Sequence, residues 1–198
     1  MYLYKDKLAS FITTIMNAPL ITLATFIPLV LIYGSYNIFN LLIITIFFGC
    51  ILPLVGVVAL LKMNLISDFY APNRDERFIP FLITIFSYLL GTIYLILLQA
   101  PGPITALMAC YLLNGIVLAL ITLKWKISIH ASGITSPVTA LVYLLGARLL
   151  PLFILLLPVI WARLELGAHS RMQLTVGAIL SSILTWYQMA FYIHTIFV

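Results

Sequence analysis

Apolar residues run along this chain in long uninterrupted stretches, and charged residues are confined to short segments between them. A bilayer-spanning helix needs only about 20 apolar residues, so the two longest stretches must each fold back once. Gly and Pro clusters at 34–37 and 101–103 mark the places where these stretches divide, because such clusters end helices and reverse the chain. The charge-free stretches cover residues 8–61, 78–123, 127–147, 149–162 and 172–198.

The pattern predicts an all-α fold, a polytopic transmembrane bundle of six or seven helices in one integral membrane domain that covers residues 1–198. The short hairpin at 131–162 turns at Gly146, and its three prolines predict kinked arms that neighbouring helices shelter. The first seven residues are too few and too polar for a cleavable signal, so we expect the first helix to stay. The predicted helices are 11–33, 38–61, 79–99, 104–123, 131–146, 149–162 and 172–197.

The amino-acid composition is also typical of a polytopic membrane protein. Hydrophobic residues make up 64% of the 198 positions and charged residues only 8%, whereas about a quarter of the residues in soluble domains are charged. Because nearly everything else is suited to lipid, the few polar residues are expected to carry most of the functional information.

The predicted topology places nine of the ten basic residues on the side of the membrane that holds the N-terminus, and Arg148 alone on the other. The positive-inside rule makes the charged side cytoplasmic, and we expect a bacterial inner membrane protein whose site faces the cytoplasm. The net charge of +5 favours anionic partners, either lipid headgroups or a lipid phosphate, and nothing indicates nucleic acid. The nine are Lys5, Lys7, Lys62, Arg74, Arg77, Lys124, Lys126, Arg163 and Arg171.

Three polar clusters border helix ends on that side, at 73–77, 124–130 and 163–173. The second contains His130 and the third His169, each at the start of a predicted helix and each near several Arg and Lys residues. Phosphoryl transfer to a side chain requires this combination: one imidazole attacks phosphorus, another protonates the leaving oxygen, and cations neutralise the phosphoryl oxygens.

The third cluster resembles the third motif of the type 2 phosphatidic acid phosphatase family, in which Ser-Arg is followed after five residues by His and after three more by Asp. Here Ala162-Arg163 is followed by His169 and then by Gln173 at those spacings. The family's Pro-Ser-Gly-His motif is echoed by residues 128–130, and one short hairpin separates the two histidines, as in the family. The resemblance covers roughly residues 74 to 180, so it implies a phosphatase-like core over about 74–198 with additional helices in 1–61.

The resemblance implies metal-independent hydrolysis of a lipid phosphate or diphosphate, of the phosphatidate, phosphatidylglycerol phosphate or prenyl diphosphate class, without a cofactor. His169 would form a phosphohistidine, His130 would act as general acid, and Arg163 would bind phosphate. Ser128 would donate a hydrogen bond. Lys124, Lys126, Arg74 and Arg77 are the candidates for the cations of the family's first motif, with Arg77 and Lys126 favoured.

Gln173 is the main departure from the family pattern, because the family has Asp there. An amide oxygen can hold the tautomer of the imidazole but cannot stabilise imidazolium as a carboxylate does. The analogous Asp to Asn change in a serine protease triad lowers turnover by about 10⁴. Glu165 is a candidate substitute for the missing carboxylate.

Three other functions are compatible with parts of the pattern. An intramembrane prenyltransferase could hold magnesium through Asp68, Asp75 and Glu76, but the chain has no second acidic cluster, and the repeated aspartates of CDP-alcohol phosphotransferases are also absent. An inactive lipid-binding or anion-binding protein would explain Gln173. A transporter is less favoured, because no charged residue lies in mid-helix.

Overall fold

The computed structural model describes residues 2–34, 37–69 and 75–197. Its regular elements in this part of the chain are all helical. The elements are α1 (Tyr2–Ile15), α2 (Ala18–Tyr33), α3 (Ile38–Ile46), the π-helix η2 (Phe47–Ile51), α4 (Leu52–Lys62), the 3₁₀-helix η3 (Asp75–Arg77), α5 (Phe78–Leu97), α6 (Gly102–Thr122), α7 (Ile129–Leu145), the 3₁₀-helix η4 (Ala147–Leu155), α8 (Leu156–Glu165), α9 (Arg171–Phe191) and the π-helix η5 (Tyr192–Ile196).

Lengths and composition fit a helical membrane bundle. Among the described residues, five helices are long and apolar enough to cross a bilayer, and the bent pair α1–α2 makes a sixth if it counts as one span. The apolar helix α7 is shorter, at 17 residues. The five long helices are Ile38–Lys62, Phe78–Leu97, Gly102–Thr122, Ala147–Glu165 and Arg171–Ile196.

The predicted continuous helix at 11–33 is wrong. The helix begins near Tyr2 and breaks after Ile15, and the segments on either side are bent by 42°. Asn17 explains the break, because its backbone is extended and its side-chain oxygen accepts a hydrogen bond from Leu20 N at 3.0 Å. It therefore caps a new helix, and Pro19 in the first turn has no N–H to continue the old one.

The helix predicted at 149–162 also differs from the structure. Gly146, with φ of 97°, makes the turn after α7. A 3₁₀ segment with Pro151 in it then runs into α8, so that the arm reaches from Ala147 to Glu165. The proline has no N–H to donate, and its ring clashes with the preceding turn of a regular α-helix.

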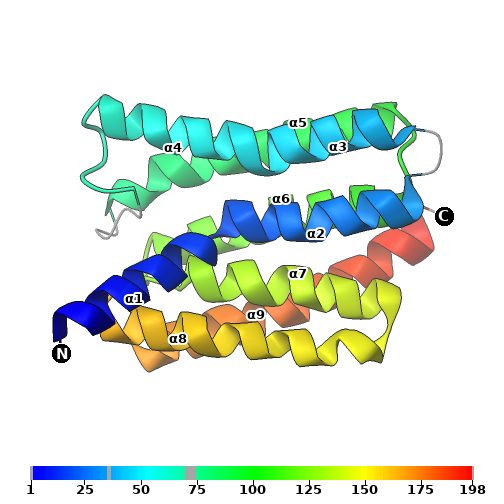
Figure 1. The fold of residues 1–198 in the computed structure, drawn as a ribbon. Helices are drawn as coiled ribbons and strands as arrows, with labels where there is room; N and C mark the ends of the chain where they lie inside the picture. Colours follow the sequence, from blue (N-terminus) through cyan, green and yellow to red (C-terminus); the bar gives the residue numbers. More distant parts are fainter. Residues whose placement is uncertain (1, 35–36, 70–74, 198) are drawn as a thin grey trace.

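The helices lie roughly parallel to one long direction of the molecule, with α3, α4 and α5 along one edge and α7, α8 and α9 along the other (Figure 1). The N-terminus, the end of α4 and the start of α7 lie at one end of the bundle, and the C-terminus lies at the opposite end (Figure 1). Between the edges lie α2 and α6 (Figure 1). Helix α2 contacts α3 and α7, and α6 contacts α5 and α9, so these two helices join the edges.

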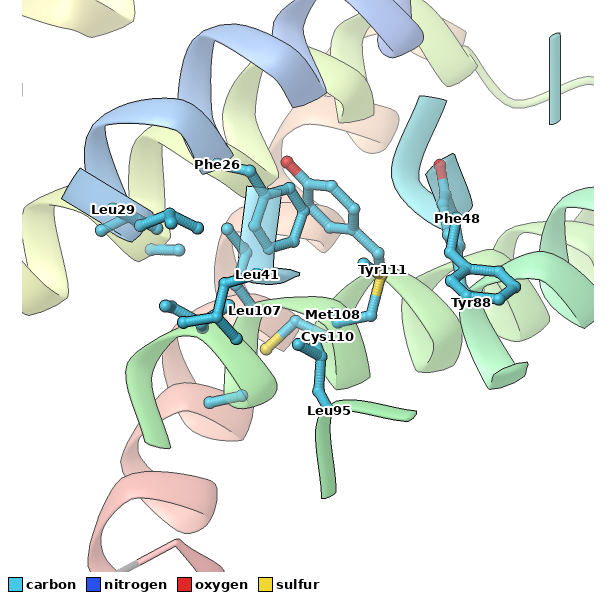
Figure 2. Packing of buried hydrophobic residues seen from close by; sticks show 14 of the residues in the cluster. Phe26, Leu29, Leu41, Phe48, Tyr88, Leu95, Leu107, Met108, Cys110 and Tyr111 are labelled. Atoms are coloured by element: carbon cyan, nitrogen blue, oxygen red, sulfur yellow. The ribbon is translucent and has the colours of Figure 1, made fainter. Parts of the chain in front are cut away.

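The main hydrophobic core forms where α2, α3, η2, α5 and α6 meet (Figure 2). The ring of Phe26 on α2 packs edge-to-face against that of Tyr111 on α6, with centroids 5.6 Å apart. Ser87 on α5 donates to the carbonyl of Phe48 at 2.7 Å, and so ties α5 to the π-helical turn of its neighbour. This packing fixes α5 and α6 against the first helices and so positions the residues at their ends.

Candidate active site

Three helices begin close together at the charged end of the bundle. Ser128 caps α7 and Ser170 caps α9 in a capping box, while α5 follows directly after Arg77. The backbone N–H of Ser128 donates to the carbonyl of Gln173 at 3.3 Å, which ties the start of α7 to the first turn of α9. Helix N-termini carry positive partial charge and exposed N–H groups, so this end of the fold favours an anion.

Two arginines bring full positive charge to the same place. Arg77 is 3% exposed and Arg163 is 5% exposed. The Arg77 guanidinium also donates to the carbonyl of Ile127 at 3.4 Å, just before α7. Burial, with a smaller effect of the nearby Arg163, lowers the pKa of Arg77 to about 10.

Lys126 completes the cation cluster. Burial lowers the pKa of its ammonium group, and the charges of Arg77 and Arg163 lower it further. Like charges held this close repel one another and disfavour their charged forms. A polyanionic ligand such as a phosphate group relieves that repulsion, so the cluster is suited to phosphate binding.

His169 is held in one orientation by Gln173. The ring nitrogen Nδ1 lies 3.1 Å from Oε1 of Gln173, and the backbone N–H of Ser170 donates to the same oxygen at 3.1 Å. A backbone N–H can only donate, so the amide atom that faces it is oxygen, and Nδ1 must therefore carry the ring proton. The lone pair is left on Nε2.

The surroundings keep this ring neutral. His169 is 7% exposed. Burial is the main reason that the pKa of His169 is lowered to about 4; the hydrogen bond with Gln173 opposes the shift, and the cations add to it. At neutral pH the imidazole is thus unprotonated, which is the form that attacks phosphorus.

His130 lies in the first turn of α7, and its ring hydrogen-bonds to the backbone of Thr13 near the end of α1. The break after α1 makes this contact possible, because α1 ends close to the start of α7 instead of continuing straight. Both histidines line one cavity of about 220 Å³ together with Arg77 and Arg163.

The cavity runs from this charged end into the bundle. Apolar side chains of α4 and α5, including Val57 and Phe81, line part of its wall. The polar residues Asn114, Ser136 and Ser181 also line it, from α6, α7 and α9. None of these three is among the predicted site residues, although an Asn within an apolar span is a signal that could have identified the first of them.

Some predicted site residues lie elsewhere. Lys124 is exposed and does not line the cavity. Ser128 is fully buried, and its hydroxyl oxygen accepts from Ala131 N as the cap of α7. Glu165 is half-buried at the end of α8 and is not among the groups that shift the pKa of His169, so Gln173 is the residue that holds the ring. Arg74 lies outside the described residues.

Comparisons with known proteins found no match: no family model, no curated protein and no solved structure matches the chain. The likeness to type 2 phosphatidic acid phosphatases therefore depends on the motif residues and on where the fold puts them. Arg77, His130, Arg163 and His169 line one end of one cavity, and Lys126 lies close enough for its charge to act on His169.

Proposed function

We propose that this protein is a membrane lipid phosphatase that works without a metal, through a phosphohistidine intermediate at His169. One observation carries the proposal: Gln173 fixes the tautomer of His169 so that Nε2 is the nucleophilic nitrogen, in a cavity that also holds His130 and two buried arginines. Nucleophile, proton donor and phosphate-binding cations thus share one site, as phosphoryl transfer requires.

In the first step, Nε2 of His169 attacks phosphorus as the bond from phosphorus to the lipid oxygen breaks. His130 donates a proton to that leaving oxygen, and the lipid alcohol forms. Burial, and after it the charge of Arg163, lowers the pKa of His130 to about 3, so its ring is neutral in the empty site. A bound phosphate offsets the positive charges of Arg163 and Arg77 and so favours uptake of the proton that His130 donates in this step. In the second step, water attacks the phosphohistidine, His130 takes its proton, and inorganic phosphate leaves.

The substrate is a lipid because the charged end of the cavity lies where spanning helices end, at the level of lipid headgroups. The phosphate reaches the cations there while the apolar part stays among the helices or in the bilayer. By the positive-inside rule we assign this end to the cytoplasmic side, and we propose a bacterial inner membrane as the location.

The phosphatase is better supported than the prenyltransferase. Magnesium on a diphosphate needs free carboxylate oxygens. Oε2 of Glu76, one of the acidic residues in question, accepts from both the backbone N–H and the hydroxyl of Ser67, at 2.8 and 2.7 Å. That carboxylate holds the segment after α4 in place, whereas the histidines and arginines face the cavity.

Phosphate release tests the proposal directly. The purified protein in detergent is given a panel of lipid phosphates and diphosphates in EDTA, and His169→Ala and His130→Ala are compared with the unaltered chain. We expect release that EDTA does not affect, that His169→Ala abolishes and that His130→Ala lowers by about 10²- to 10⁴-fold. His194→Ala is the matched control, because His194 is exposed in η5 at the opposite end.

Trapping the intermediate sharpens the result. With a radiolabelled lipid phosphate, acid-labile label should accumulate on the unaltered chain and be absent from His169→Ala. If correctly folded protein releases no phosphate from any lipid, the phosphatase proposal is wrong, and the anion-binding protein without catalysis becomes the better interpretation.

A further inference from the structure

The inner part of the cavity is lined by neutral polar side chains rather than by charges. Tyr111, Asn114, Ser136 and Ser181 all line it, and each is at least nine-tenths buried. They come from α6, α7 and α9 and stand well inside the spanning part of the bundle. Polar groups at such depth are costly unless they are satisfied, so their presence together requires an explanation.

Ser181 is the clearest case, because its hydroxyl has no hydrogen-bond partner among the described residues and its exposure is 0%. A helical serine ordinarily donates to the carbonyl four residues earlier. Here that carbonyl, of Gly177, accepts from Ser132 of α7 at 3.0 Å instead. Since the Ser181 hydroxyl has no partner in the described part of the chain and Ser181 lines the cavity, this hydroxyl is available to a group inside the cavity.

Tyr111 adds a second donor. Its hydroxyl lies beside those of Thr22 and Thr25 on α2, yet within the described part of the chain no contact of this hydroxyl has the geometry of a full hydrogen bond. The hydroxyl of Thr22 already donates along its own helix, to Ala18 O at 2.8 Å. Tyr111 is 8% exposed, so bulk water does not satisfy it either.

The polar atoms of the Asn114 side chain are all engaged, and the one unsatisfied acceptor in its network among the described residues, Oε1 of Gln188, belongs to a residue that does not line the cavity. The amide nitrogen of Asn114 donates to Ser136 at 3.0 Å and to Thr185 at 2.8 Å, and its oxygen accepts from Gln188 at 2.9 Å. Ser136 and Thr185 share a further bond at 2.8 Å, so one of the two hydroxyls keeps a proton to donate elsewhere. The inner end of the cavity is thus rich in donors and uncharged, and it suits a neutral acceptor oxygen.

The distance from the charged end to the inner end of the cavity matches the distance between phosphate and ester oxygens in a glycerolipid. Ser136 follows His130 by six residues, which is about 9 Å along a helix. In a glycerolipid phosphate, roughly six covalent bonds of about 1.4 Å separate phosphorus from the outer oxygen of an ester. A prenyl phosphate has only hydrocarbon at that depth and would leave the donors unsatisfied.

We infer that the inner end of the cavity is a subsite for the ester or ether oxygens of a glycerolipid phosphate, and that it selects such lipids over prenyl phosphates. The inference depends on the proposed function for the position of the phosphate, and it names the substrate class. Discrimination of this kind is strong when a site is built to hydrogen-bond a group that the competitor lacks, because buried donors are then left unpaired.

Binding rather than turnover tests the subsite. Dissociation constants are measured by native mass spectrometry in detergent for dioleoyl phosphatidate, its dialkyl ether analogue and geranylgeranyl phosphate. Ser181→Ala should weaken binding of both glycerolipids by roughly three- to tenfold, the effect of one neutral hydrogen bond, and leave binding of the prenyl phosphate unchanged. Tyr111→Phe, which removes a second hydroxyl only, should act in the same direction.

Ser182→Ala is the matched control. Ser182 is the next residue on α9, it does not line the cavity, and its hydroxyl donates to Ala178 O at 2.9 Å. The thermal stability of lipid-free Ser181→Ala should be equal to or above that of the unaltered chain, since the change removes a buried hydroxyl without a partner.

Two results would overturn the inference: prenyl phosphate binding as tightly as the glycerolipids, or Ser181→Ala and Tyr111→Phe weakening all three lipids equally or none. A weaker effect on the ether than on the ester supports the carbonyl oxygen as the bound group, and an equal effect supports the oxygen bonded to glycerol. Selective binding without any phosphate release would reject the proposed phosphatase and keep the subsite.

Discussion

Under the proposed function, the two ends of the cavity recognise a ligand by different physical means. At the charged end, Arg77, Arg163 and Lys126 surround the histidines and act by charge. At the inner end, hydroxyl and amide groups such as those of Ser181 and Asn114 act by the direction of individual hydrogen bonds. Charge provides affinity for any phosphate, whereas directed donors distinguish one phosphate-bearing lipid from another.

The ends also differ in how the fold builds them. The charged end is assembled from the starts of α5, α7 and α9 and the end of α8, so its residues cluster beside helix termini. The inner end is assembled from mid-helix positions whose side chains bond across α6, α7 and α9. Substitutions at the first should change activity toward all lipid phosphates, and substitutions at the second should change selectivity or stability.

The largest effect is expected at the charged end. Arg163→Gln should lower kcat/KM for every hydrolysed lipid phosphate by about a hundred- to a thousandfold, because it removes a buried charge that stabilises the phosphoryl oxygens. Steady-state phosphate release measures the loss, and Arg148→Gln is the control, since Arg148 is exposed in η4, which follows the end of α7 that lies away from the site. A loss confined to glycerolipids would show that the charged end also selects between lipids and is not a general phosphate site.

Gln173→Glu tests whether the amide limits the chemistry. The change keeps the shape of the side chain and places a carboxylate oxygen against Nδ1 of His169, where it stabilises positive charge on the ring. We expect kcat to rise at least tenfold, by analogy with the cost of the reverse change in a serine protease triad. Single-turnover kinetics measure the rate of the chemical step apart from product release. An unchanged single-turnover rate would show that the hydrogen bond to Nδ1 does not limit the chemistry.

The pH dependence follows from the same contact. His169 must be unprotonated to attack, and its pKa is lowered to about 4, so kcat/KM should fall about tenfold per pH unit once the pH is below about 4. In Gln173→Glu the carboxylate raises the pKa of the ring, and this acidic limb should move to higher pH. A limb that stays in place in the variant would indicate that a group other than His169 titrates.

Most helices were predictable because hydropathy alone identifies apolar stretches of spanning length. The break after α1 was not, because it depends on one capping residue, Asn17, inside a stretch that is apolar on both sides. The convergence of His130 and His169 was predictable from their helix-end positions. Ser128 was assigned to phosphate because the sequence does not show that its oxygen is used to cap α7.

The inner end was missed for a related reason: Ser and Asn scattered over three helices form a pattern only after those helices are packed together. Ser136 and Ser181 are 45 positions apart, and neither has a charged neighbour to draw attention to it. The chemistry of the charged end is encoded within short motifs, whereas the donors of the inner end are encoded by helix register.

The smallest effect on lipid binding is expected from Gln188, which supports the inner end without lining the cavity. Its amide donates to the oxygen of Asn114 at 2.9 Å and so helps to orient the donors there. Gln188→Met keeps the length of the side chain and leaves that oxygen unsatisfied. We expect a loss of about 1 kcal/mol in unfolding free energy, since a buried acceptor loses its partner while a second buried polar atom, Oε1 of Gln188, is removed with it.

Phosphatidate binding to Gln188→Met should weaken by less than about threefold, because Asn114 keeps both bonds that its nitrogen makes. Prenyl phosphate binding should not change. Thermal unfolding in detergent and native mass spectrometry measure the two effects, and Tyr187→Phe, at the exposed neighbouring position, is the control. A tenfold loss for both lipids would mean that the network holds the whole cavity open, and that the two ends are one mechanical unit rather than two independent recognition sites.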